Sequence, residues 1–305
     1  MLTEIYYEVD EFCKRERDNF QIILHQRGIY RKKHPSSLSL SEIMTILIYY
    51  HYSDYRTFKA FYKKGVLGVY HSDFPTAPSY NRFVELIPRA GIPLRAFVAY
   101  RCSQAQRTGV HFIDSTKLPV CLVPRAHQHK VFRGWAAKGK TSTGWFYGLK
   151  LHLIINNLGQ LVNFYLTPGN IADNHALVLF KLTRSLAGTF YADAGYQMNL
   201  DKRLLLEFQR PVCFIVKPRK NMKLKQEPLL YKDLLWLKKR PIIESVLDIQ
   251  KQHLDLNLTR HRSPTNGFIT ILANLAAYSF YPNKPSAQIK TIYELKQPEE
   301  SKKAA

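Results

Sequence analysis

The spacing of hydrophobic residues changes once along the chain, near residue 106. Before that point apolar side chains recur every three or four positions, as Ile5, Val9 and Phe12 do, which predicts helices with one buried face. Ser39 and Glu42 have the S-x-x-E spacing of a capping box just before an apolar run, which predicts a helix start. We therefore predict a helical module over residues 1–105, with helices at 1–33, 39–50, 55–64, 79–87 and 94–106.

After residue 106, short apolar runs alternate with helical spacings. Residues 145–156 alternate between two faces, and residues 157–160 supply turn residues before a returning strand at 161–166. The other predicted elements are strands at 110–116, 189–193 and 212–216 and helices at 173–186, 200–209, 234–256 and 266–281. This order is typical of a ribonuclease H-like α/β domain, a mixed sheet flanked by helices. We predict such a domain over 106–282, with C-terminal helices, and a flexible tail over 283–305.

The charge balance indicates a polyanionic partner. The chain has 305 residues, with 45 Lys and Arg against 23 Asp and Glu, a formal net charge of +22. DNA or RNA is the usual partner of so basic a chain. An anionic membrane is the main alternative, but no basic amphipathic helix with a long apolar face is evident.

Cysteine usage and hydropathy narrow the class of protein further, because they argue against zinc-binding, secreted and membrane-spanning proteins. The four cysteines form no C-x-x-C pair, which argues against a zinc ribbon or disulfide scaffold and favours a reducing cytoplasm. Acidic residues interrupt the N-terminus where a signal sequence would need an apolar core. The longest uncharged apolar stretch, 267–281, is too short for a comfortable membrane span.

Two carboxylates end short apolar runs, and a third lies on a late helix. Asp114 and Asp193 each follow such a run, and each alone is most simply a residue that caps a turn. In the predicted sheet their strands are neighbours, so both side chains emerge at one edge, and Glu244 can fold over them. Three such carboxylates form the acidic triad that two-metal phosphoryl transfer requires, and they favour hard ions such as Mg²⁺, with Mn²⁺ as a substitute. Asp173 is predicted to cap the helix that follows it.

Basic residues gather in two segments beside this edge. His127 and His129 have no third ligand at metal-binding spacing, so phosphate contact is the preferred interpretation of their segment. The predicted DNA-contacting residues of the two segments are Lys130, Arg133, Lys138, Lys140, Lys217, Arg219 and Lys220. The aromatic and basic helix at 55–64 is compatible with helix–turn–helix DNA binding, and a plain helical bundle explains it equally well.

Several motifs resemble those of bacterial transposases of the insertion-sequence 982 family, which carry a DDE triad. The motifs are Phe-Ile-Asp-Ser-Thr (112–116), His-Lys-Val-Phe-Arg-Gly (129–134), Gly-Trp-Phe-Tyr-Gly-Leu-Lys-Leu-His-Leu (144–153), Leu-Thr-Pro-Gly-Asn (166–170), Asp-Ala-Gly-Tyr (193–196), Ile-Ile-Glu-Ser-Val (242–246) and Arg-His-Arg-Ser (260–263). They extend over most of residues 105–280. The resemblance implies that Asp114, Asp193 and Glu244 are the catalytic, metal-binding triad.

The resemblance also implies a reaction and its partners. Arg240 and Lys251 match the Arg-x3-Glu-x6-Lys signature of related transposases and are expected to contact DNA near the scissile phosphate. The implied activity is Mg²⁺-dependent cleavage at terminal inverted repeats and transfer of the 3′-OH into target DNA, by a homodimer or larger assembly on the bacterial nucleoid. Two departures from the family pattern are Leu237, where Tyr is usual, and Ala194, where Lys is common. The alternatives are a hydrolysis-only nuclease on the same fold and a DNA-binding relative that has lost catalysis.

Overall fold

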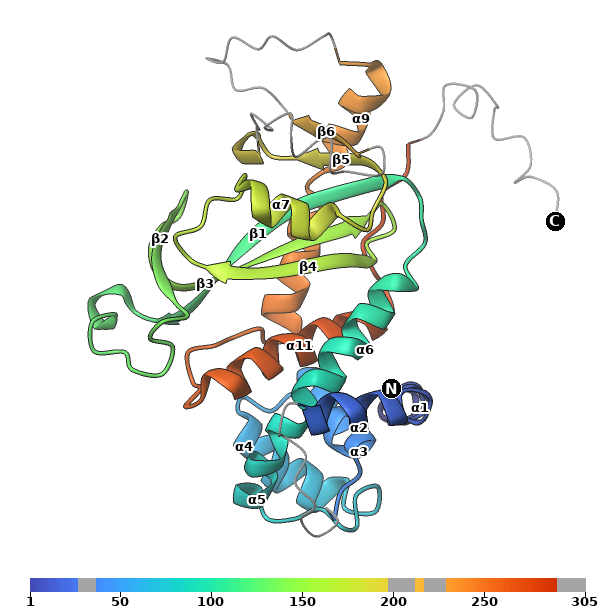
Figure 1. The fold of residues 1–305 in the computed structure, drawn as a ribbon, viewed down its shortest axis with the longest axis vertical. Coiled ribbons are helices and arrows are strands. Elements are labelled where there is room, and N and C mark those ends of the chain that lie inside the picture. Colours follow the sequence, from blue (N-terminus) through green and yellow to red (C-terminus); the bar gives the residue numbers. More distant parts are fainter. Residues whose placement is uncertain (27–36, 197–211, 217–228, 290–305) are drawn as a thin grey trace, which may run out of the picture.

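The computed structural model describes residues 1–26, 37–196, 212–216 and 229–289. Within these ranges the molecule is elongated, with a helical region at one end and a β-sheet toward the other (Figure 1). The helical region contains α1 (Leu2–Arg15), α2 (Arg17–Gln26), α3 (Leu40–Tyr49), η1 (Tyr50–Tyr52), α4 (Phe58–Ala60), η2 (Phe61–Val69), α5 (Tyr80–Leu86), η3 (Ile87–Ala90) and α6 (Gly91–Ser103). This agrees with the helical module predicted from the sequence.

Side-chain caps start three helices in this region, α3, α4 and α5, through Ser39, Thr57 and Ser79. Ser39 Oγ accepts a hydrogen bond from the Glu42 amide at 3.1 Å, and the Glu42 carboxylate accepts one from the Ser39 amide at 2.6 Å, so the predicted capping box is confirmed. The helix predicted at 55–64 does not end at the glycines that follow it but continues as the π-helix η2 to Val69. There Phe61 and Tyr62 are buried, and packing of this aromatic face outweighs the helix-weakening effect of glycine.

In the part of the chain that the structure describes, six strands form one mixed sheet. They are β1 (Val110–Cys121), β2 (Ala137–Thr141), β3 (Gly144–Asn156), β4 (Leu161–Pro168), β5 (Gly188–Ala192) and β6 (Val212–Val216). The order is β2-β3-β1-β5-β6, with β4 paired to β3, and β1, β2 and β4 all run antiparallel to β3. β5 runs parallel to β1, and β6 runs parallel to β5. The predicted ribonuclease H-like mixed sheet is therefore confirmed.

Strand β1 is longer than predicted, and this changes the position of Asp114. The sequence predicted that the strand ends at or near this residue, but β1 continues to Cys121 because β3 pairs with it as far as Tyr147. What ends near Asp114 is the parallel pairing with β5, whose last paired residue on β1 is Phe112. Asp114 therefore lies in mid-strand, at the point where β1 loses its parallel neighbour.

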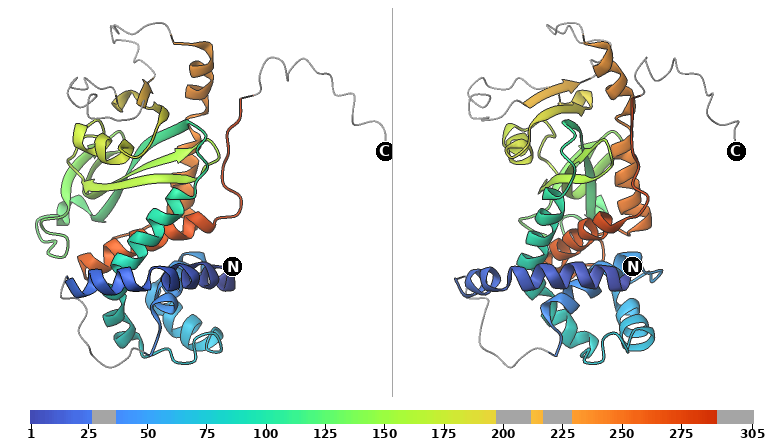
Figure 2. Two further views of the ribbon diagram at one scale, coloured as in Figure 1. Left: turned by 45° about the vertical axis from the view of Figure 1, so that its right-hand side comes forward. Right: turned by 90° about the vertical axis from the view of Figure 1, so that its right-hand side faces the viewer.

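Helices cover both faces of the sheet. On one face α7 (Ala176–Thr183) packs on a cluster that includes Ile113 and Phe190. On the other face α10 (Ile242–Asp248) and its neighbours pack on a cluster that includes Phe112 and Tyr191. Figure 1 shows α7 on the near side of the sheet and the orange helix after α9 passing behind it, and the right-hand view of Figure 2 shows the two on opposite sides of the sheet. Adjacent residues of a strand thus point into different cores.

The long helix predicted at 234–256 is broken into three parts. The parts are α9 (Tyr231–Lys239), α10 (Ile242–Asp248) and the π-helix η6 (Ile249–His253). The break falls at Pro241, which has no amide hydrogen to donate and whose ring clashes with the preceding turn. Trp236 of α9 contacts the rings of Phe112 and Tyr191, so this helix packs on the sheet despite the break.

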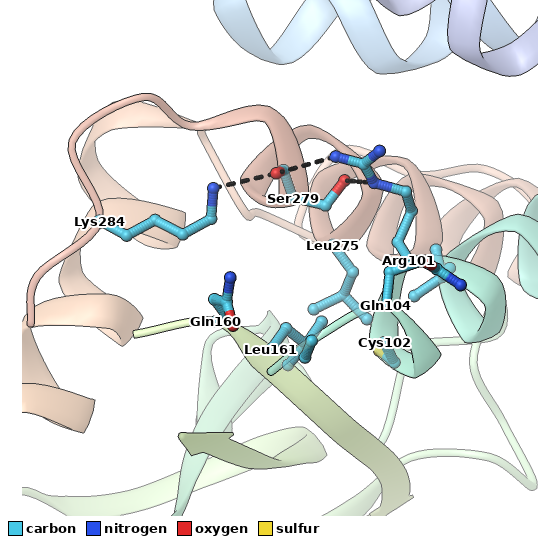
Figure 3. A pocket seen from close by; sticks show the side chains of 10 residues that line it. Arg101, Cys102, Gln104, Gln160, Leu161, Leu275, Ser279 and Lys284 are labelled. Carbon is cyan, nitrogen blue, oxygen red and sulfur yellow. Dashed lines mark hydrogen bonds between the residues drawn. The ribbon is translucent and has the colours of Figure 1, made fainter. Parts of the chain in front are cut away.

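The last helix, α11 (Pro264–Phe280), packs against α6 and joins the helical region to the sheet. Figure 3 shows a pocket at this junction, where Arg101 Nε donates to Ser279 Oγ at 3.1 Å and Lys284 Nζ donates to the Ser279 carbonyl at 3.0 Å. Both cations thus contact the C-terminal end of α11, where the helix dipole is negative. None of the three predicted catalytic carboxylates lines this pocket.

Some predictions fall partly or wholly outside the described residues. The tail predicted from residue 283 begins with a stretch that contacts the sheet, since the Ala287 amide donates to the Asn157 carbonyl at 2.7 Å. The helix predicted at 200–209, the basic residues after β6 and the tail from residue 290 lie outside the described ranges. Within those ranges, no helix is long and apolar enough to cross a membrane.

Candidate active site

The last residues that pair between β1 and β5 are Phe112 and Tyr191. Asp114 and Asp193 each follow two residues later, Asp114 within β1 and Asp193 just after β5 ends. Because side chains alternate along a strand, Asp114 lies on the same face of β1 as Phe112. This is the face on which α10 packs, with Glu244 in its first turn.

Asp114 is held by the guanidinium of Arg240. Arg240 Nη2 donates to Asp114 Oδ2 at 2.8 Å, and both side chains are largely buried, at 15% and 18% exposure. Burial raises the pKa of the Asp114 carboxyl to about 6, and the Arg240 charge opposes this rise. Asp114 Oδ1 also accepts the amide of Ser115 at 2.8 Å. The first predicted carboxylate is therefore buried, oriented and partly neutralised by an arginine.

The same arginine reaches Glu244. Arg240 Nη1 donates to Glu244 Oε1 at 3.0 Å, so one guanidinium joins two carboxylates that are far apart in sequence. The Glu244 side chain is 56% exposed. Arg240 lies at the junction of α9 and α10, rather than within the continuous helix predicted over 234–256.

Lys251 lies on η6 and is half-buried. Burial lowers the pKa of its ammonium, the charge of Asp248 opposes this, and the charges of Lys117 and Asp114 also reach it. Lys117 belongs to β1, three residues beyond Asp114. Two ammonium groups therefore lie within electrostatic range of each other beside the candidate site.

Asp193 lies just beyond the end of β5, at the start of a 3-10 turn (η5, Ala194–Tyr196), and it is exposed. Its Oδ1 accepts the amide of Ala194 at 2.6 Å, and its carbonyl accepts the amide of Tyr196 at 2.9 Å. The tight turn predicted after this aspartate is present. The carboxylate is thus fixed at the end of its strand and open to solvent.

The sequence predicted that Asp173 caps the helix after it, and this prediction is wrong. Helix α7 begins at Ala176 with His175 at its N-cap, and Asp173 instead accepts hydrogen bonds from Ser115 Oγ at 2.7 Å and Lys150 Nζ at 3.1 Å. His152 is fully buried beside it, and burial lowers the pKa of its imidazole to about 4. Ser115, Lys150 and His152 have no predicted role in the site. The odd-even alternation of side chains along β1 and β3 is the sequence signal that places them on one face.

The predicted DNA-contacting residues have different environments. Lys130, Arg133, Lys138 and Lys140 are exposed, and the ammonium groups of Lys138 and Lys140 lie 4.9 and 5.7 Å from the ring centroid of Trp145. His129 stacks on Phe132, and no metal-binding group forms around it among the described residues. Lys217, Arg219 and Lys220 lie outside the described residues.

Comparison with known proteins identifies the family. The chain matches the family described as a transposase DDE domain over residues 104–264, more than half of its length, and it belongs to that family. Among solved structures it is similar to the cryo-EM structure of the piggyBac transposase synaptic complex with hairpin DNA. The TM-score is 0.51 at 12% sequence identity, covering 91% of this chain and 71% of that chain. At this identity the likeness concerns the fold. No curated protein matches the chain.

The donor set fits a divalent metal in its chemistry. DDE transposase domains typically use divalent ions, and three carboxylates supply the hard oxygen ligands that such ions prefer. In the described residues no three Asp, Glu, His or Cys side chains are close enough together to hold a metal, and Arg240 bonds to two of the three carboxylates. An ion that used Asp114 Oδ2 and Glu244 Oε1 would therefore have to displace the guanidinium.

Proposed function

We propose that this protein is a divalent-metal-dependent DNA transposase of a bacterial insertion sequence, of the insertion-sequence 982 family. It would cleave phosphodiesters at the ends of its element and join the freed 3′-OH to target DNA. The observation that carries the proposal is that one guanidinium, Arg240, joins Asp114 to Glu244, with Asp193 directly after the strand that runs parallel to β1. Membership of the DDE transposase family supplies the reaction class.

The proposed catalytic residues are Asp114, Asp193 and Glu244, which would hold two Mg²⁺ ions or Mn²⁺ in their place. When bound, such ions activate the attacking oxygen and stabilise the leaving oxygen of a phosphodiester. The protein's own contribution is to hold Asp114 within β1 and Asp193 directly after the adjacent strand β5. A rigid sheet limits the reorganisation that the reaction requires.

Arg240 and Lys251 are proposed to contact the DNA near the scissile phosphate. A phosphate offers the Arg240 guanidinium the same bidentate partner as a carboxylate, so DNA can exchange with Asp114 and Glu244. Lys251 lies close enough to Asp114 for their charges to interact, which suits a cation directed at the same phosphate. Binding of DNA would thus release the carboxylates as the substrate arrives.

The exposed basic side chains beyond β1 are proposed to hold the DNA backbone. Lys130, Arg133, Lys138 and Lys140 carry this role among the described residues, and Lys217, Arg219 and Lys220 are proposed for it from the sequence. The partners are the terminal inverted repeats and the target DNA. Two ends must be brought together, so we propose at least a homodimer on DNA, in the bacterial cytoplasm at the nucleoid.

An end-joining assay tests this function. The substrate is a precleaved duplex with a free 3′-OH, taken from the DNA that flanks the gene, together with supercoiled plasmid in Mg²⁺ or Mn²⁺. We expect the duplex to become joined to the plasmid. Hydrolysis without joining would instead indicate a nuclease on the same fold. Tight binding with no cleavage in either ion would indicate a DNA-binding relative that has lost catalysis.

A further inference from the structure

A polar cluster lies beneath Asp114, on the opposite face of the sheet. We call Ser115, Lys150 and Asp173 the anchor cluster. Asp173 Oδ1 accepts from Ser115 Oγ at 2.7 Å and from Lys150 Nζ at 3.1 Å, and Lys150 Nζ also donates to the Ile171 carbonyl at 2.9 Å. One carboxylate oxygen therefore joins β1, β3 and the loop that follows β4.

The anchor cluster is well placed to be rigid. The Lys150 side chain is 8% exposed and the Asp173 side chain 32%, so the ion pair is shielded on the lysine side. A charged donor and acceptor in such a setting form a stronger hydrogen bond than two neutral groups do. His152, buried beside Asp173, is kept neutral at neutral pH, because burial lowers the pKa of its imidazole to about 4. Lys150 therefore supplies the positive charge that the carboxylate needs.

Ser115 links the anchor cluster to the candidate active site. Its side chain donates to Asp173, while its backbone amide donates to Asp114 Oδ1 at 2.8 Å. The orientation of the Ser115 peptide therefore determines where the amide points, and the amide in turn restricts the Asp114 carboxylate. At this level β1 no longer pairs with β5, so the sheet holds this part of the strand from one side only.

Tyr196 connects the same cluster to the second aspartate. It is fully buried three residues after Asp193, in the core that contains Ile113 and α7. Burial raises the pKa of its hydroxyl, and the charges of Asp114 and Asp173 raise it further, so both carboxylates lie within electrostatic range. The turn that carries Asp193 is thereby packed beside the anchor cluster.

We propose that Ser115 and Asp173, with Lys150, are positioning residues that hold the Asp114 carboxylate in its catalytic orientation from the opposite face of the sheet. This proposal rests on the proposed function, because it assumes that Asp114 acts on the DNA substrate. The anchor cluster itself does not contact the reacting groups. It acts through the Ser115 amide, and its loss would misdirect a ligand rather than remove one.

The first test reads the Ser115 amide without DNA, metal or catalysis. In protein labelled with ¹⁵N-serine, the Ser115 signal is the one that disappears in Ser115→Thr. Asp173→Ala should shift this signal and speed its hydrogen exchange, because the side-chain partner of Ser115 is gone. Asp73→Ala, which removes an exposed carboxylate in the helical region, is the control and should leave it in place. An unmoved Ser115 signal in Asp173→Ala overturns the proposal.

The second test compares two side chains of nearly equal shape. Ser115→Thr keeps the hydroxyl and Ser115→Val loses it, and β-branched residues suit a strand in both cases. We expect Ser115→Val to lower kcat for strand cleavage by about tenfold to a hundredfold, with KM for DNA within about twofold, because small misplacements reduce turnover more than binding. Ser115→Thr should restore most of the rate.

The two tests separate this inference from the proposed function. If the wild-type chain and Ser115→Thr cleave DNA and Ser115→Val cleaves equally well, the positioning role is wrong and the transposase assignment stands. If the wild-type chain does not cleave DNA, the transposase assignment is wrong, and so is the proposed role of the anchor cluster in catalysis. The amide spectrum then still decides whether Asp173 holds Ser115.

Discussion

At the scale of single residues, the site depends on how the negative charge of the buried Asp114 carboxylate is neutralised. A buried carboxylate is costly unless a partner neutralises it, and here that partner is Arg240, which also reaches Glu244. The arginine therefore stabilises the protein without DNA and keeps two proposed ligands together. The same contact occupies one oxygen of each carboxylate, and an ion that used those oxygens would have to displace the arginine.

The raised pKa of Asp114 predicts a specific pH dependence of stability. Its folded pKa of about 6 lies above the ordinary value of 3.8, so the ionised carboxylate costs stability above pH 6 and the cost disappears as the pH falls toward 4. Asp114→Asn changes the free energy of unfolding relative to the wild type. This change should be more stabilising, or less destabilising, at pH 7 than at pH 4, by at most about 3 kcal/mol. Urea unfolding in EDTA at the two pH values measures this. Asp73→Asn, at an exposed site, is the control, and a change of opposite sign would contradict the account.

Sequence reasoning succeeds for residues whose neighbours are local. Asp114 and Asp193 could be singled out because each follows an apolar run, and the capping box at Ser39 is a pattern within four residues. The bond from Arg240 to Asp114 joins positions 126 residues apart, and no local pattern indicates it. Asp173 resembled a helix cap because it precedes a helix, but its ion pair with Lys150 depends on the packing of β3 against the loop.

At the scale of elements, the register of β5 against β1 decides whether Asp193 lies near Asp114. Strand β5 begins at Gly188, one residue before its first pair with β1; Gly188 has a φ of +119°, and a Cβ atom there would lie 2.4 Å from the Gly109 carbonyl oxygen. Only glycine adopts this conformation without strain and without a clash. This glycine therefore fixes how closely the two strands approach at their start.

Gly188→Ala should lower the free energy of unfolding by about 2–4 kcal/mol, since it adds backbone strain to a steric clash. Gly68→Ala is the matched control, because Gly68 has an ordinary φ and open space around its Cβ position. That control should stay within about 1 kcal/mol of the wild type. Urea unfolding compares the pair, and equal effects of the two substitutions would show that the β5 start is not constrained.

The element boundaries show where periodicity stops being informative. Hydrophobic spacing alone predicted one helix over 234–256, yet Pro241 divides it and η6 widens its end. Proline rules predict a break at this position, whereas the apolar spacing continues on both sides of it and does not reveal the break. The extension of β1 past Asp114 depends on pairing with β3, which is distant in sequence, so the local sequence pattern alone does not predict it.

At the scale of the whole molecule, the charge of +22 is the property most easily read from the sequence. The structure adds that Lys130, Arg133, Lys138 and Lys140 are exposed on the segment between β1 and β3. Exposed cations that contact phosphates release counterions, so binding should weaken steeply with salt.

Removing one such cation should reduce the salt dependence of DNA affinity by the contribution of a single phosphate contact. For Lys138→Ala, the slope of log affinity against log salt should fall by about one, with little change in sequence preference. Lys14→Ala is the control, since Lys14 is exposed on α1 and paired with Asp10 and Glu11. Fluorescence anisotropy over a range of salt concentrations measures both. An unchanged slope for Lys138→Ala would remove this residue from the proposed DNA surface.

The central claim is that three acidic side chains from β1, the end of β5 and α10 act together on DNA. Strand cleavage of a plasmid that carries both element ends, in Mg²⁺ and in Mn²⁺, tests it most directly when Asp114→Asn, Asp193→Asn and Glu244→Gln are compared with the wild type. The account predicts that each substitution abolishes cleavage in both ions while binding to the ends persists. Cleavage at the wild-type rate by any one of the three variants would contradict it.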